Sequence, residues 1–129
     1  MHYLIVTMGV HEMAACCDYL AERVTSDDTV TVVGLAPGEE AHATRDAREA
    51  LNVAAVRLPA VGDVQTTLLT DVDDPASSLL EAVATADANE LLLSPNDERS
   101  AGLATTGSVV QRLLGRSPIP IVVVPRTDL

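Results

Sequence analysis

The sequence predicts an α/β fold: a single doubly wound sheet of five parallel strands with helices on both faces. Three observations predict it. Five apolar segments alternate with segments of helical character along the 129 residues. Such alternation of strands and helices is typical of a parallel sheet that is covered on both faces. The length suits one core, so we assign residues 1–129 to one domain, with right-handed crossovers that place helices on both faces.

The first strand is predicted at Tyr3–Met8, a short apolar run. A helix is predicted at Glu12–Val24, because apolar residues recur there at the spacing of one helical face. These residues are Met13, Cys17, Leu20, Ala21 and Val24. After a turn at residues 26–28, the β-branched segment Thr29–Gly34 predicts the second strand, which Pro37 and Gly38 end.

Residues 39 to about 51 are rich in alanine and arginine and predict a second helix. Residues 52–58 leave two alternatives open, a continuation of this helix or an extended segment, so the structure of residues 52–62 is not predicted. Pro59 and Gly62 interrupt the chain, and Val64–Thr70 is predicted as the third strand.

The next helix is predicted to start at Asp74-Pro75, with Asp74 as the N-cap and Pro75 at the first helical position. Glu90–Ser94 is predicted as the fourth strand. A last helix is predicted to start at Gly107-Ser108, with a buried stripe that comprises Val109, Val110, Leu113 and Leu114.

Gly115 stands where a C-capping glycine is expected, and Pro118 and Pro120 prevent the last helix from continuing. Ile119–Val124 is then predicted as the fifth strand.

The charge of the chain limits its partners. Nineteen acidic and eight basic residues give a formal net charge of −11, and every basic residue is arginine. This composition favours a protein of concentrated salt, where the Debye length falls to about 3 Å at 1 M, over an ordinary acidic mesophilic protein. It excludes nucleic acid and anionic membranes as partners. With no leader and no long apolar run, we expect a cytoplasmic protein whose Cys16 and Cys17 are free and unreactive.

No set of catalytic or metal-binding residues emerges from the pattern. His11-Glu12 begins like a zinc-peptidase motif, but Ala15 stands where the second histidine is needed, and His2 and His42 have no spaced partners. Asp71, Asp73 and Asp74 are better explained as an acidic turn with a helix cap than as a cation site. We therefore expect neither a metal nor an enzymatic activity.

The candidate site lies at the carboxyl ends of the strands, where ligands bind in doubly wound sheets. The loops to examine are residues 8–12 and 94–108. Gly107-Ser108 begins a helix, and the free N–H groups and dipole of a helix N-terminus favour an anion.

The chain resembles the universal stress protein family over nearly its whole length. The resemblance rests on Met8-Gly9-Val10, on Asp73-Asp74-Pro75, on Gly107-Ser108-Val109 and on Ser117–Val124. It implies a five-stranded sheet of order 3-2-1-4-5. It also implies a homodimer through the last strand, formed by Ile121, Val122, Val123 and Val124.

The resemblance also implies ATP or another adenine nucleotide as the ligand. Members that bind ATP carry a spaced pattern of three glycines followed by Ser or Thr. Here Ser94 and Asp97 stand at the first two glycine positions, and Met8 stands where the family has an acidic residue that contacts adenine. The implied site residues are Gly9, Val10, Ser94, Gly107, Ser108 and Val109.

Two hypotheses follow for the function. The first is a non-enzymatic stress-response or regulatory module whose ATP binding is lost or weakened, because the acid and two glycines are replaced. The alternative is a functional adenine-nucleotide-binding protein that uses a modified loop. The sequence names no protein partner beyond a second copy of the chain.

Overall fold

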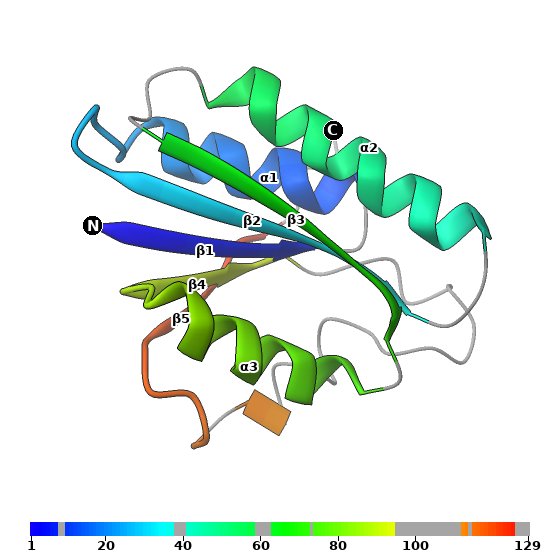
Figure 1. Cartoon of the computed structure of the whole chain (residues 1–129). Helices are drawn as coiled ribbons and strands as arrows, with labels where there is room; N and C mark the ends of the chain where they lie inside the picture. The colour runs from blue at the N-terminus through cyan, green and yellow to red at the C-terminus, as the bar shows by residue number, and fades with distance from the viewer. Residues whose placement is uncertain are drawn as a thin grey trace.

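Five parallel strands form one sheet in the order β3-β2-β1-β4-β5, as Figure 1 shows. The computed structural model describes residues 1–7, 10–37, 41–58, 63–72, 74–94, 112–113 and 115–125. The strands are β1 (His2–Thr7), β2 (Thr29–Pro37), β3 (Asp63–Val72), β4 (Glu90–Leu93) and β5 (Ile121–Val123). The helices are α1 (Val10–Ala21), α2 (Ala41–Arg57) and α3 (Pro75–Ala86). The predicted fold class and strand order are confirmed.

The sheet has a separate core on each face. Helices α1 and α2 cover one face and α3 covers the other (Figure 1). Successive residues of β1 pack into the cores on opposite faces of the sheet. Ile5 packs on the side of α1 and Leu4 on the side of α3, and neither side chain is exposed. This double burial explains why β1 and β4, in the middle of the sheet, are the more apolar strands, whereas the edge strand β3 carries exposed polar residues.

Helix α2 resolves the alternative left open for residues 52–58, because the helix continues to Arg57. Ala47, Ala50 and Ala54 are fully buried at helical spacing, so the helix presents a smooth face of small side chains to the sheet. Gly34 of β2 permits the close approach. A Cβ there would lie 2.9 Å from the carbonyl oxygen of Ala47.

Some predicted boundaries were wrong, and β5 differs most. It spans Ile121–Val123 rather than residues 119–124. Proline has no N–H to donate to the ladder, so Pro120 contributes only its carbonyl, which accepts a hydrogen bond from the N–H of Leu91 at 3.0 Å. Strand β2 runs beyond Gly34 to Pro37, which pairs with Val72 after a shift in register. Helix α1 begins earlier than predicted and ends at Ala21.

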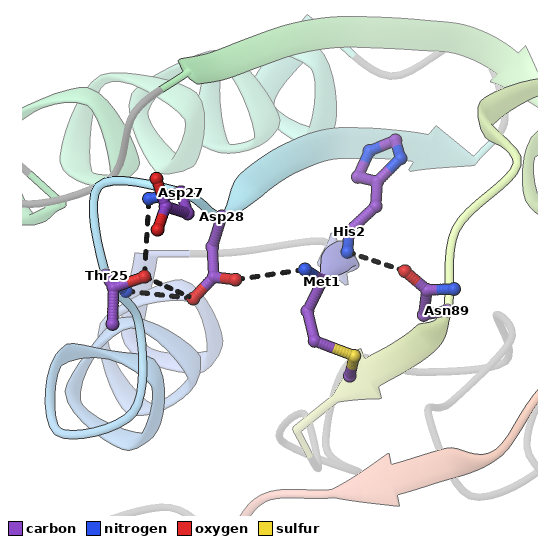
Figure 2. A network of polar contacts seen from close by, with 6 residues as sticks. All are labelled: Met1, His2, Thr25, Asp27, Asp28 and Asn89. Carbon is purple, nitrogen blue, oxygen red and sulfur yellow. Dashed lines mark hydrogen bonds and ion pairs between the residues drawn. The ribbon is translucent and has the colours of Figure 1, made fainter.

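Polar contacts join the elements at the amino end of the sheet (Figure 2). The Met1 ammonium contacts the Asp28 carboxylate at 3.0 Å, and the N–H of Thr25 donates to the same carboxylate at 2.8 Å. The N–H of His2 donates to the side-chain oxygen of Asn89 at 2.8 Å. The start of β1 is thereby tied to the turns before β2 and β4.

The predicted stop of the last helix is confirmed. Arg112 and Leu113 are helical, and Gly115 follows with φ +80°, a conformation that glycine adopts without a Cβ clash. The N–H groups of Arg116 and Ser117 both donate to the Leu113 carbonyl at 3.0 Å. No helix among the described residues is long and apolar enough to cross a membrane.

Candidate functional site

The order of strands reverses between β1 and β4. These strands are neighbours in the middle of the sheet, and the chain leaves them in opposite directions, toward β2 and toward β5. Ile5 of β1 pairs with Leu92 of β4 in parallel register. Two residues further along each strand, Thr7 and Ser94 stand at the carboxyl edge. Doubly wound proteins bind their ligands at this kind of reversal.

Ser94 carries an unsatisfied buried hydroxyl at this edge. Its residue is 2% exposed, and its Oγ is the one buried side-chain N or O atom of the described residues that lacks a hydrogen-bond partner. Leaving such a group unpaired costs about 1–3 kcal/mol. The Ser94 hydroxyl is thus free to form a hydrogen bond with a ligand bound at the strand reversal.

Two of the six predicted site residues lie in the described part of the chain, and both are at the carboxyl edge. Ser94 follows β4 directly, and Val10 is the first residue of α1, shortly after β1 ends. The other four residues, Gly9, Gly107, Ser108 and Val109, lie outside the described residues, as do Met8 and Asp97.

Thr7 belongs to the same edge and was not singled out by the sequence. It ends β1, it is 4% exposed, and it pairs in register with Gly34 of β2. The sequence contained one signal, a hydroxyl residue in an otherwise apolar strand. That signal is weak, because threonine is common in buried strands.

Asp74 stands beyond the end of β3 and is the N-cap residue of α3, with Pro75 at the start of the helix, as predicted. Its side chain makes no capping hydrogen bond. Its carboxylate instead accepts two hydrogen bonds from the Arg112 guanidinium and one from the Ser77 hydroxyl. The contact with Arg112, followed by that with Ser77, lowers the pKa of Asp74 to about 2. Bidentate, charge-assisted pairs of this kind are stronger than a neutral cap.

The two cysteines offer no nucleophile. Both are free and fully buried in α1, as predicted. Burial raises the pKa of each thiol to about 12, so neither forms the thiolate that attacks a substrate. Within the described residues, no three histidine, cysteine or acidic side chains gather into a metal-binding group.

The outer edge formed by β5 exposes part of the predicted dimer seam. Val123 is 47% exposed, and Ile121 and Val122 are partly buried. Val124 follows the strand and is only 5% exposed, because it packs into the core on the side of α1. The exposed apolar surface of the seam is therefore centred on Val123.

These features define a doubly wound α/β protein with a candidate ligand site at the reversal of its strand order. The universal stress protein family matches residues 19–125, and the chain belongs to that family. A search of curated proteins gave no match.

Solved structures support the same fold. A protein of this family from Burkholderia pseudomallei is 18% identical, with a TM-score of 0.67, and the match covers 96% of this chain and 95% of that one. The universal stress protein of Archaeoglobus fulgidus in complex with dAMP is 15% identical, with a TM-score of 0.63 and coverage of 96% and 97%. A universal stress protein in complex with cAMP is 15% identical, with a TM-score of 0.63, and 98% of each chain is covered.

Proposed function

We propose that this protein is a non-enzymatic stress-response or regulatory module whose binding of ATP is weakened. One observation carries the proposal. Ser94 stands at the first glycine position of the nucleotide pattern, and its side chain is buried at the carboxyl end of β4. A glycine at this position lets backbone N–H groups approach a phosphate closely, and a buried Cβ and hydroxyl occupy that room.

The charges of the loop support the same proposal. Asp97 and Glu98 follow Ser94 where a triphosphate would be cradled. Two like charges 4 Å apart repel by about 1 kcal/mol in water and about 4 kcal/mol near a protein surface. A ligand with fewer negative charges would lose less affinity than ATP.

The absence of enzymatic activity is part of the proposal. The buried thiols have raised pKa values, and the His2 ring contacts Thr31 at 2.7 Å near the opposite, amino edge of the sheet. The thiols thus supply no thiolate, and the one histidine ring whose contact is described lies away from the strand reversal.

Two further parts of the proposal concern assembly and environment. The exposed Val123 on a three-residue edge strand supports a homodimer in which β5 pairs with its copy. The net charge of −11 without lysine supports a cytoplasmic protein that works in concentrated salt.

A second candidate is a nucleotide-binding protein that uses the modified loop, and the unpaired Ser94 hydroxyl favours it. In this case Ser94 would bond an adenine nucleotide held near Gly9, Val10, Gly107, Ser108 and Val109. Solved relatives in complex with dAMP and with cAMP support a ligand with one phosphate.

Equilibrium dialysis in molar KCl separates the two candidates. We expect Mg-ATP to bind weakly to the unmodified protein and more tightly to Ser94→Gly, whereas Ser94→Ala, which keeps the Cβ, should not gain. If the hydroxyl instead bonds a nucleotide, both variants should weaken AMP binding by about two- to tenfold. Saturable micromolar binding of ATP to the unmodified protein would exclude the first candidate.

A further inference from the structure

A groove of about 870 Å³ lies between α3 and the strands β2 and β3, on the face opposite α1 and α2. It extends from Asp74 at the carboxyl edge to His2 at the amino edge, and neither Thr7 nor Ser94 lines it. Its volume is within the range of sites for small molecules. The groove is therefore a second candidate site, distinct from the strand reversal.

Short and polar side chains line much of the groove. On this face β1 and β4 present the buried Leu4 and Leu91. Strand β2 presents Thr31 beside the buried Val33, and β3 presents the exposed Gln65 and Thr67. The opposite wall of the groove is formed by α3, whose lining side chains are mostly small and include Ser78, Ala82 and Ala86. Small side chains on α3 opposite these strands leave the space between them unfilled.

The chemistry of the lining favours a cation. No lysine, arginine or aromatic side chain is among the described lining residues, and the His2 ring is engaged with the Thr31 hydroxyl at 2.7 Å. Glu81 is exposed at the groove and takes part in none of the ion pairs found among the described residues. Hydroxyl and amide oxygens, such as those of Thr67 and Gln65, add acceptors.

The groove also offers apolar surface beside these acceptors. Leu69 and Ala82 are partly buried at its walls, and Val33 is buried at its floor. A ligand that uses both kinds of surface carries a positive group on an apolar chain. At low ionic strength the net charge of −11 would also attract such a cation to the protein.

We propose that this groove binds alkylammonium cations of the diamine and polyamine class. One ammonium group donates hydrogen bonds to the Glu81 carboxylate and to neighbouring hydroxyls, and the methylene chain packs against Leu69 and Ala82. This site does not depend on the nucleotide function proposed above.

NMR titration with 1,6-diaminohexane tests the proposal, with 1,6-hexanediol as the neutral ligand of equal length. The titration uses the full chain at the lowest KCl concentration at which it stays folded. We expect saturable shifts of the Leu69 and Ala82 methyl signals with the diamine and none with the diol. Glu81→Gln should weaken diamine binding about tenfold, the size of a lost charge-assisted hydrogen bond.

Two control variants make the test specific. Glu22→Gln removes an equal charge from an exposed site outside the groove and should leave the affinity unchanged. Ala82→Leu fills the groove without a change of charge and should abolish the saturable shifts. Equal losses in the two glutamine variants, or equal binding of diamine and diol, would overturn the proposal.

Discussion

Arg112 and Asp74 are joined by two hydrogen bonds, of 2.5 and 3.1 Å, although 38 residues separate them in the sequence. The pair ties the last helical segment to the start of α3. Leu113, the next residue, is fully buried in the core between the sheet and α3. A polar contact and an apolar contact thus fix this segment from two adjacent residues.

The ion pair predicts a loss of stability in acid. The pKa of Asp74 is about 2 in the folded protein against an ordinary value of 3.8, so the unfolded chain takes up the proton first. The stabilisation is complete above about pH 3.8 and is lost as the pH falls toward 2. Asp74→Asn should therefore lower the Tm at neutral pH, and the difference from the unmodified protein should shrink in acid.

Asp27→Asn, an exposed carboxylate outside this pair, is the control and should leave the acid dependence unchanged. Because both side chains of the pair are about half exposed, molar KCl should reduce the effect of Asp74→Asn. Parallel pH profiles for Asp74→Asn and the unmodified protein would contradict the assignment.

The contact between β2 and α2 predicts the effect of Gly34→Ala. The added Cβ would meet the Ala47 carbonyl at 2.9 Å and the Leu51 side chain at 3.2 Å, so the helix must move away. Overpacking of this kind costs about 1–3 kcal/mol, measured by urea unfolding. Gly115→Asn is the comparison variant, because a Cβ at Gly115 would meet no atom within 4 Å. Any loss there comes from the φ of +80° alone, which asparagine tolerates better than most residues, so it should be smaller than for Gly34→Ala. An unchanged midpoint for Gly34→Ala would show that the helix is not packed so closely.

Thiol labelling of the two cysteines tests how tightly the core beneath α1 is packed. Cys16 and Cys17 are fully buried, and burial raises both thiol pKa values to about 12. A thiol reagent at mildly alkaline pH should label neither residue in the folded protein and both in urea. Rapid labelling of the folded protein would contradict this packing.

A charge placed on β5 tests whether this edge strand forms the proposed dimer interface. Val123→Arg should convert the proposed dimer to a monomer in light scattering at high salt, because a charge would be buried where two edge strands pair. Val56 on α2 is 78% exposed, and Val56→Arg should leave the dimer intact. If the unmodified protein is monomeric, the proposed dimer through β5 is wrong.

Much of the fold followed from local patterns. Short apolar or β-branched runs predicted the strands, and Gly115 predicted the helix stop, because each signal depends on a few adjacent residues. The end of α2 could not be predicted, since Ala54 and Leu58 are buried against elements distant in the sequence. The contact of the Asp74 carboxylate with Arg112 could not be predicted either, because 38 residues separate the two in the sequence.

The candidate site was predictable in position but not in its particulars. The strand reversal follows from topology, and Ser94 was found by counting back from Gly107. The burial of its hydroxyl without a partner required the packing of β4 between β1 and β5. The groove beside α3 was missed, because its lining residues come from strands and a helix that only the folded chain brings together.

Equilibrium dialysis of the unmodified protein with Mg-ATP in molar KCl is the direct test of weakened ATP binding. We predict no saturable binding at micromolar ATP, with a gain of affinity in Ser94→Gly that Ser94→Ala does not share. Saturable micromolar binding of ATP by the unmodified protein would show that Ser94 and the acidic loop do not weaken the site.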